Sequence, residues 1–553
     1  MAENRFYDYA TGKEVKNNPE EAYRQLFEHI LIDDLGYPKE NIDIEVVLQR
    51  GSNRNAEEVD IVVYNSNIHK QENAYIIIEI ETPKKKYDLQ APYCVWFGGF
   101  EKNSEGPFYH YRDLKKDPTN FILIPTLPRY GETQETIGQY RKQDLKPAKA
   151  LKLLFSRMYY HLYGNGPIKR EENIAVEVIK LLFCKIMDEI SPDELCEFRA
   201  TPTEVTSAGK KAIRKRIDSL YHKLLQDPDF GKMFKGESIE YDNDWVAYIV
   251  SELQGIALMH EETNTDALGD AYEILLPSTL KGDSGQFFTP REIVRFAMDV
   301  ISPSYKDNEI ILDTACGSGG FLSIAIEKLR QQINELYKNR GFSNDRLNGL
   351  LKDYADKYIY GCDIDPLLYR ISKSYMAIVG DGKSNIYNFD SLEPYAKLDS
   401  NFRGRIKPRS VDIITTNPPF GTHIKDTRRS VLEQYELGHK LVNGIPQEEL
   451  LDGQDPDKLF VERDIFYLKE ATQSKDGGRM VIVLPKQNLS GAQEESVEFR
   501  KWLLNKVQIV AVVDLPREAF QPHTGTKTSL VFLKKVKQIP EEYPIFMAVS
   551  EAV

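Results

Sequence analysis

The arrangement of apolar and polar positions divides the chain into three regions. Residues 1–130 begin with a polar helical stretch and continue with short β-branched runs separated by polar or glycine-containing turns, which is typical of an α/β fold. Residues 131–280 contain segments with apolar positions around nearly the whole helical circumference, which predicts a domain of buried helices. In the last region, 281–553, strand-like and helical segments alternate from Ile310 onward, which predicts a mainly parallel sheet with helices on both faces.

The length and net charge of the chain indicate how many domains it has and argue against some binding functions. A chain of 553 residues is too long for one hydrophobic core, and its length alone suggests about three or four domains. The formal net charge of −13 argues against a general polyanion binder, but DNA binding requires only a local basic surface. One local basic run occupies residues 209–216, and we interpret it as a solvated helix face in preference to a phosphate contact.

The sequence has no pattern typical of membrane insertion or secretion. No apolar run approaches the roughly 18–20 residues that span a bilayer, and residues 1–15 lack the basic-then-apolar pattern of a signal peptide. The five cysteines are scattered, without a CxxC pair or zinc-ligand spacing. These features predict a cytoplasmic protein with reduced thiols and no membrane partner.

A glycine-rich turn follows the first strand of the third region. The strand ends in Asp313, and Ala315, Gly317 and Gly319 lie in the turn before the next helical segment. Glycines between a strand and a helix let the backbone approach a ligand closely at the carboxyl edge of a sheet. Taken alone, this turn predicts either a nucleotide site or a tight turn without a ligand.

Acidic residues also end the next two strands. Asp363 and Ile364 close the second strand, and a carboxylate there suits a ribose diol, whose two hydroxyls donate to it. Asp390 follows the third strand and is either a ligand of the same molecule or a helix-capping or turn residue. The charged segment 330–357 separates the first two acids and is interpreted as a helical surface insertion.

The sequence Asn-Pro-Pro-Phe at 417–420 follows the next strand-like run. Together with GQFFTP at 285–290, DTACGSGGF at 313–321 and the CDIDP acids between them, it resembles the N6-adenine DNA methyltransferases of type I modification subunits. The resemblance covers roughly residues 240–540 and implies a Rossmann-like fold that binds S-adenosyl-L-methionine. It assigns to that cofactor Phe288, Thr289, Pro290, Asp313, Ala315, Gly317, Gly319, Asp363, Ile364 and Asp390.

The same resemblance implies how adenine is activated. The Asn417 side-chain oxygen and the Pro418 carbonyl would accept both amine hydrogens, so that the nitrogen lone pair points at the methyl donor. Pro418 and Pro419 would fix the backbone in advance. Phe420 would stack on a base that has left the duplex, with a core aromatic as the alternative. The chain contains no Pro-Cys pair, so it lacks the thiol nucleophile of cytosine carbon-5 methylation.

Two further segments resemble parts of the same family. GQFFTP would lie near the methionine end of the cofactor, although Thr289 is also suited to cap the following helix with Pro290 at its first position. In the distal part of the domain, Phe520 and Thr526 are assigned either to the target-base pocket or to a surface loop.

Three acidic residues of the first region form a candidate metal site. Asp60 lies on one strand, and Glu79 and Glu81 lie on the same side of the next, so hard oxygen ligands for Mg²⁺ converge. This pattern resembles the PD-(D/E)xK-type nuclease region at the amino terminus of type I restriction subunits. Glu81 occupies the position of that family's lysine, and Lys84 or Lys85 is a candidate substitute. The resemblance also allows an active nuclease with a glutamate at this position, and the alternative is a degenerate scaffold that binds DNA and does not cut it.

These features favour a fused restriction-modification enzyme that methylates double-stranded DNA at adenine and contains a nuclease-like domain. A modification-only subunit, with a docking or assembly domain at its amino terminus, is the first alternative; a catalytically silent DNA-binding scaffold is the second. No segment long enough for target recognition follows the methyltransferase region. We therefore expect either a missing carboxyl-terminal recognition domain or a separate specificity subunit, with truncation slightly preferred.

Overall fold

The structure is a computed structural model. It describes residues 5–16, 19–49, 56–80, 91–97, 107–117, 120–147, 151–228, 230–259, 274, 289–337, 340–379, 385–420, 425–473, 477–520 and 525–550.

The chain divides into two compact units, Met1–Leu275 and Leu276–Val553. The boundary proposed after residue 130 lies inside the first unit and stays a prediction. Among the helices in the described ranges, none has both the length and the apolarity needed to cross a lipid bilayer.

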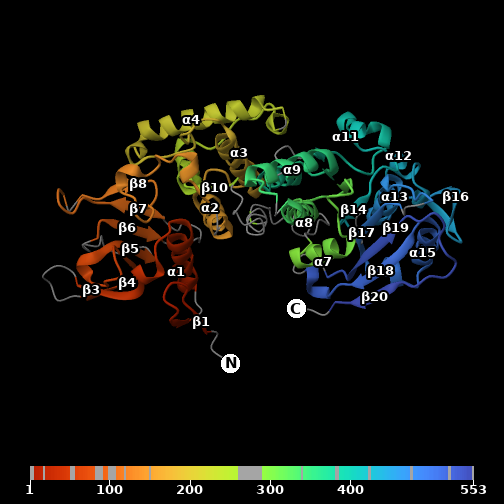
Figure 1. The fold of residues 1–553 in the computed structure, drawn as a ribbon, viewed down its shortest axis with the longest axis horizontal. Coiled ribbons are helices and arrows are strands. Elements are labelled where there is room, and N and C mark those ends of the chain that lie inside the picture. Colours follow the sequence, from red (N-terminus) through yellow and green to blue (C-terminus); the bar gives the residue numbers. More distant parts are fainter. Residues whose placement is uncertain are drawn as a thin grey trace. The chain divides into compact units, whose positions relative to one another are not determined.

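The first unit contains a six-stranded sheet (Figure 1). Its strands, in spatial order, are β3 (Ile42–Gln49), β4 (Ala56–Tyr64), β5 (Ala74–Ile80), β6 (Tyr93–Phe97), β7 (Phe108–Tyr111) and β8 (Ile122–Ile124). Neighbouring strands are antiparallel except β5 and β6, which are parallel. Helix α1 (Pro19–His29) packs Phe27 into the same core as Ile61 and Ile78 of the sheet. The predicted α/β character of this region is confirmed.

Helices follow this sheet in the same unit. They are α2 (Leu151–Asn165), α3 (Glu171–Ile190), α4 (Ser207–Gln226) and α5 (Asn243–Leu253). Helix α3 is buried along most of its length, as its apolar pattern predicted, and its buried Lys180 forms an ion pair with Glu177 at 2.6 Å.

The basic run 209–216 lies on α4, where part of its charge is used within the chain. Lys210 pairs with Asp244 at 2.6 Å, and Arg216 pairs with Glu204 at 2.6 Å. Two other lysines of the run are exposed. The structure therefore agrees with a helix face whose charge is partly paired within the chain, and a phosphate contact by the exposed lysines stays untested.

The second unit is built around an eight-stranded sheet (Figure 1). Its strands, in spatial order, are β13 (Asn385–Asn388), β12 (Ile359–Asp363), β11 (Ile311–Asp313), β14 (Ile413–Thr416), β17 (Arg479–Pro485), β19 (Thr528–Lys534), β18 (Gln508–Asp514) and β20 (Phe546–Val549). Only β19 runs antiparallel to its neighbours, β17 and β18. The predicted mainly parallel sheet is confirmed.

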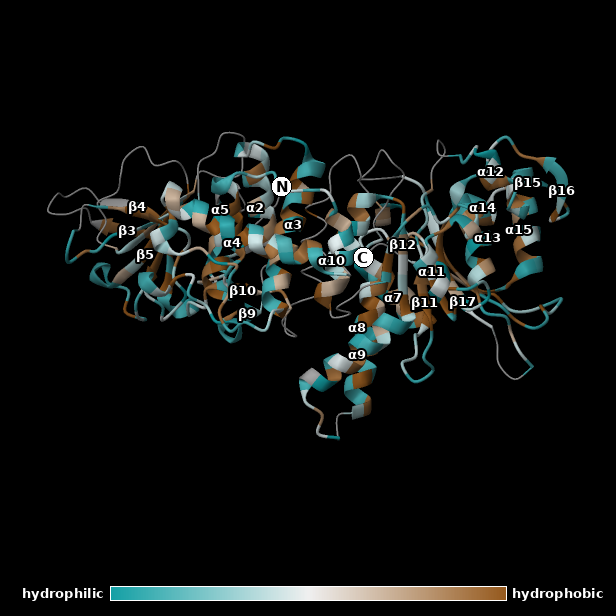
Figure 2. Cartoon of the chain, turned by 90° about the horizontal axis from the view of Figure 1, so that it is seen from above, coloured by the Kyte–Doolittle hydropathy of each residue, from teal (hydrophilic) through white to brown (hydrophobic). Residues whose placement is uncertain are grey.

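The remaining elements of the second unit are helices and one hairpin. They are α7 (Arg291–Ile301), α8 (Gly320–Tyr337), α9 (Asn344–Tyr358), α10 (Pro366–Val379), α11 (Ser400–Arg405), α12 (Arg429–Leu432), α13 (Pro456–Tyr467), α14 (Lys486–Ser490), α15 (Glu494–Lys506), and the strands β15 (His439–Val442) and β16 (Ile445–Leu450). The predicted helical insertion forms the end of α8 together with α9, and this end projects from the rest of the unit (Figure 2).

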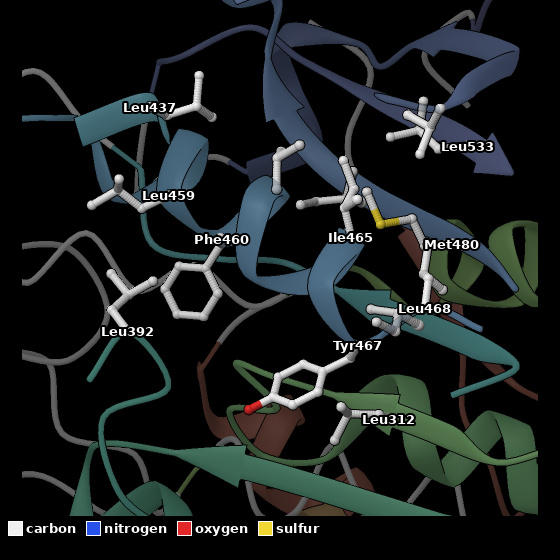
Figure 3. Packing of buried hydrophobic residues seen from close by; sticks show 14 of the residues in the cluster. Leu312, Leu392, Leu437, Leu459, Phe460, Ile465, Tyr467, Leu468, Met480 and Leu533 are labelled. Carbon is white, nitrogen blue, oxygen red and sulfur yellow. The ribbon is translucent and has the colours of Figure 1, made fainter. Parts of the chain in front are cut away.

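Helix α13 packs on the sheet of the second unit. Leu459 and Tyr467 of this helix lie in one buried cluster with Leu312 of β11 and Met480 of β17 (Figure 3). All four side chains are essentially inaccessible to solvent. This dense packing holds the ends of β11 and β14 in fixed positions, which is where the candidate site lies.

Candidate active site

Four neighbouring parallel strands end at the same edge of the second sheet. Asp313 ends β11, Asp363 ends β12, Asp390 follows β13, and Asn417 follows β14. From β11 the chain continues to β12 on one side, whereas β14 lies on the other side, so strand order reverses between β11 and β14. Ligands of open parallel sheets bind at such a reversal, beyond the carboxyl ends of the strands. The structure thus brings the predicted cofactor acids and the Asn-Pro-Pro-Phe motif to one edge.

Asp363 holds the glycine-rich turn. Its Oδ2 accepts the amide hydrogen of Gly317 at 2.8 Å, and its Oδ1 accepts that of Asp365 at 2.9 Å. Gly317 and Gly319 have φ angles of 54° and 89°, which favour glycine because a Cβ would be strained there. A Cβ on Gly319 would also lie 2.9 Å from the Ser372 Oγ. Both glycines are therefore needed for the shape of the turn.

The residues after Asp363 have separate roles. Asp365 caps helix α10, because its Oδ1 accepts the amide hydrogens of Leu367 and Leu368 at 2.8 and 3.0 Å. Ile364 is 59% exposed although it follows a fully buried strand. An exposed apolar side chain beside a buried acid is suited to cover the flat face of a ligand.

Burial governs the protonation of the two inner acids. It raises the pKa of Asp313 to about 7, although the nearby Thr416 side chain and the hydrogen bond from the Ala315 amide favour the ionised form. It also raises the pKa of Asp363 to about 6, against hydrogen bonds from the Asp365 and Gly317 amides. Hydroxyl donors on a bound ligand would stabilise the ionised carboxylates further.

Asp390 forms a turn and an ion pair. Its Oδ1 accepts the Leu392 amide hydrogen at 2.9 Å, which fits the turn alternative, and its role as a cofactor ligand stays a prediction. Its Oδ2 lies 2.6 Å from Nη2 of Arg428. The neighbouring Ser391 hydroxyl donates to the Thr314 carbonyl at 2.6 Å, which ties this turn to the residue after Asp313.

Two residues of this edge have no counterpart in the sequence prediction. Arg428 carries no local motif. Asp464 of α13 is fully buried and accepts the Thr314 hydroxyl hydrogen at 2.8 Å. Arg428 and Asp464 each contact a residue that is distant in the sequence. Neither position could therefore be predicted from a local motif or from hydrophobic periodicity.

The aromatic side chain of the target motif is covered in this structure. Phe420 and Phe520 are both buried, with ring centroids 6.0 Å apart and planes at 84°. The burial of Phe420 fits the core-aromatic alternative, and the surface-loop alternative for Phe520 is wrong because its side chain is inaccessible. The target-pocket role of each residue stays a prediction. Because Phe420 is inaccessible in this structure, adenine stacking on it would require the groups around it to move. Thr526 is partly buried, and its role stays a prediction.

The GQFFTP segment is only partly described. Phe288 lies outside the described residues, and Thr289 and Pro290 are partly exposed. Helix α7 begins at Arg291 with Pro290 as its N-cap, so the prediction that Thr289 caps the helix is wrong by one residue. Pro290 is extended, with ψ near 141°, which keeps it outside the helix.

Two of the three proposed metal ligands are described in the first unit. The pairing of β4 with β5 ends at Ile61 and Ile78, and Asp60 and Glu79 are the next residues along the two strands. The Asp60 Oδ2 accepts the Ile80 amide hydrogen at 2.7 Å, and Glu79 is 9% exposed. Glu81 lies outside the described residues. Within the described part, no group of three or more His, Cys, Asp or Glu side chains could hold a metal ion.

Comparison with known proteins was made for the whole sequence. The profile of the family "N-6 DNA Methylase" matches residues 263–552, more than half of the chain, and includes the whole strand-end site. The chain belongs to the N-6 DNA methylase family. A second profile, "Type I restriction enzyme R protein N terminus", matches residues 19–94, which contain Asp60 and Glu79.

Several methylase subunits of type I restriction enzymes are similar to this N-6 DNA methylase. The EcoEI type I methylase subunit of Escherichia coli is 29% identical over 268 residues, 48% of this chain and 46% of its own length. The MjaIX methylase subunit of Methanocaldococcus jannaschii is 26% identical over 304 residues, 54% of this chain and 46% of its own length. The chain thus spans about half the length of these curated relatives.

Solved structures are also similar, and one of them serves as an example. It is a modification subunit of a putative type I restriction enzyme from Vibrio vulnificus YJ016, with 20% identity and a TM-score of 0.49. The similarity covers 72% of this N-6 DNA methylase and 82% of that chain.

Proposed function

We propose that this chain transfers a methyl group from S-adenosylmethionine to the exocyclic amine of adenine in double-stranded DNA, as part of a restriction-modification system. One observation carries the proposal. Asn417-Pro-Pro-Phe follows β14 at the point where strand order reverses, and the glycine-rich turn follows the adjacent strand β11. S-adenosylmethionine bound at the glycine-rich turn and an adenine bound at the Asn-Pro-Pro-Phe motif would therefore lie next to each other.

The groups at the strand ends fit the donor. Asp363 would accept the ribose hydroxyl hydrogens, and Asp390, one strand further out, would accept a hydrogen of the purine amine. Ile364 would cover the purine face. When bound, S-adenosylmethionine supplies a methyl group on a positively charged sulfur. The tight backbone of Gly317 and Gly319 leaves room for close approach.

Asn417 and Pro418 would prepare the target amine. The amide oxygen and the proline carbonyl accept its two hydrogens, which concentrates the nitrogen lone pair in the direction of the donor. Two consecutive prolines limit backbone freedom, so these acceptors need little rearrangement at reaction. Phe420 would contact the extruded base once the groups around it have moved.

Substitution of Asn417 tests this proposal. In Asn417→Ala, transfer of tritiated methyl groups to DNA should fall by about a hundredfold or more, because a positioned acceptor is removed. Donor binding, measured by calorimetry, should remain within about twofold of the original chain, since the amide would contact the base and not the donor. Undiminished transfer in this variant would contradict the assignment.

We also propose a second function for the first unit, where Asp60 and Glu79 lie on adjacent strands just beyond the Ile61–Ile78 pair. Two carboxylates on adjacent strands, in a segment similar to the R-protein amino terminus, support Mg²⁺-dependent DNA cleavage. Mg²⁺ would be held by these oxygens together with Glu81, and would activate water. The alternative is a domain that docks DNA or assembles subunits without cutting.

The proposed partners follow from the relatives. The similar proteins are named as methylase subunits of type I restriction enzymes, so we propose that this chain also works with a DNA-specificity element, either a separate subunit or a further domain. A silent DNA-binding scaffold remains the third proposal; absence of both donor binding and methyl transfer would favour it.

A further inference from the structure

Arg428 lies among three carboxylates at the edge of the methyltransferase site. Its Nη2 is 2.6 Å from Asp390 Oδ2 and 2.5 Å from Asp426 Oδ2, and its Nη1 donates to Glu393 Oε1 at 3.1 Å. Its Nε also donates to Asp426, at 3.1 Å. One guanidinium group therefore binds three acids from two separate segments.

These acids come from the two sides of the site. Asp390 and Glu393 follow β13, on the side of the site where S-adenosylmethionine is proposed to bind. Asp426 lies in the segment that follows the Asn-Pro-Pro-Phe motif in the chain. Asp426 is itself fixed, because its backbone forms an antiparallel bridge with Gln454, with N–O distances of 2.8 and 3.0 Å. Arg428 thus connects the donor side to the chain segment after the target motif.

Burial distinguishes this cluster from an ordinary surface ion pair. The side chains of Asp390 and Asp426 are 15% and 7% exposed, and that of Arg428 is 46% exposed. Exposed single pairs contribute little, because water screens them. A planar guanidinium held by several partly buried oxygens keeps one orientation, since its donors are fixed relative to one another.

We propose that Arg428 is a positioning residue that holds the Asp390 carboxylate toward the purine amine of the donor and links it to the segment after the target motif. This inference rests on the proposed function, because it requires Asp390 to bind the donor. Asp390 has one oxygen on the Leu392 amide and the other on Arg428. Loss of the guanidinium would free the second oxygen to rotate away from the donor.

The test compares Arg428→Gln and Arg428→Lys with Arg429→Gln. Arg429 is the neighbouring cation; its side chain is 82% exposed and pairs with Glu433 within one turn. Binding of S-adenosylmethionine and of its inosine analogue, which lacks the purine amine, is measured by calorimetry, and melting temperatures are measured in parallel. The analogue reports whether the amine is still recognised.

Arg428→Gln should raise the Kd for S-adenosylmethionine about tenfold or more, as expected for loss of a charge-assisted contact. The original chain should prefer the natural donor over the inosine analogue, and Arg428→Gln should lose most of this preference. Arg428→Lys should recover part of it, and Arg429→Gln should retain it. Asp426→Asn should weaken the preference in the same direction, because Asp426 orients Arg428.

Two results would overturn the proposal. If Arg428→Gln melts at a lower temperature but keeps the preference for the natural donor, Arg428 has only a structural role. If the original chain binds the donor and methylates DNA while Arg428→Gln binds both compounds as the original does, the inference fails and the proposed function stands. A chain that binds neither compound would overturn both.

Discussion

The Asp363 carboxylate accepts the amide hydrogen of Gly317 at 2.8 Å, so the acid at the end of β12 fixes the turn that follows β11. The other carboxylate oxygen accepts the Asp365 amide hydrogen at 2.9 Å. One side chain thereby sets the relative position of two neighbouring strand ends. We infer that Asp363 both shapes the donor site and contributes to it.

Replacing Asp363 with Asn should weaken donor binding. The asparagine side chain keeps one acceptor oxygen but loses the negative charge that strengthens hydrogen bonds from the ribose hydroxyls and the Gly317 backbone amide. We therefore expect the Kd for S-adenosylmethionine to rise about 10–100-fold. Calorimetric titration measures this change. Asp399→Ala is the matched control: it removes the N-cap of α11 and should lower stability by about 1 kcal/mol without changing donor affinity. Equal effects of the two substitutions on affinity would contradict the account.

Donor affinity should increase with pH between about 5 and 7. Burial raises the pKa of Asp363 to about 6 and of Asp313 to about 7 in the folded chain. Both pKa values are higher than those of the same groups in the unfolded chain. The two acids therefore stabilise the folded state at low pH, and this contribution to the free energy of unfolding is lost as the pH rises to about 7. The ribose hydroxyls of bound S-adenosylmethionine would donate hydrogen bonds that favour the ionised carboxylates. Binding of S-adenosylmethionine should therefore offset this loss of folding stability.

Paired thermal melts measure this pH dependence. The increase in melting temperature caused by S-adenosylhomocysteine, a donor product without the reactive methyl, should grow from pH 5 to pH 7. In Asp363→Asn, the part of this growth centred near pH 6 should disappear. A ligand-induced shift that is constant or falls over this range in the original chain would contradict the proposed role of the acids.

Cleavage by the first unit should depend on Asp60 and Glu79. Asp60→Asn and Glu79→Gln should each abolish Mg²⁺-dependent cutting of DNA, because each removes a negatively charged metal ligand, while adenine methylation is unchanged. Glu58→Gln is the control, since Glu58 is an exposed acid on the same strand β4. An original chain that methylates its DNA but does not cut it with Mg²⁺ would favour the docking-domain alternative.

The strand-end acids and the target motif were predictable from the sequence. Apolar strand patterns placed Asp313, Asp363 and Asn417 at the ends of successive strands, and parallel pairing brings such ends to one edge. Local pattern and sheet geometry were sufficient for these residues. In the first unit, side-chain alternation along a strand predicted only that Glu79 and Glu81 share one side, and the antiparallel pairing of β4 with β5 comes from the structure.

Other features depend on contacts that have no local signal. The ion pair between Asp390 and Arg428 and the packing of Phe420 on Phe520 join segments distant in sequence. Side-chain contacts of this kind are determined by how loops pack and leave no periodic trace in the chain. The N-cap of α7 differed by one residue, at Pro290 instead of Thr289, which is the usual uncertainty of a helix end.

The identity of the methylated nucleoside tests the central claim most directly. The chain is incubated with unmethylated genomic DNA and S-adenosylmethionine carrying an isotope-labelled methyl group, and the DNA is then digested and analysed by mass spectrometry. The account predicts that the label appears in N6-methyl-2′-deoxyadenosine and is absent from the Asn417→Ala reaction. Label in 5-methyl-2′-deoxycytidine, or label in adenine that persists without Asn417, would contradict it.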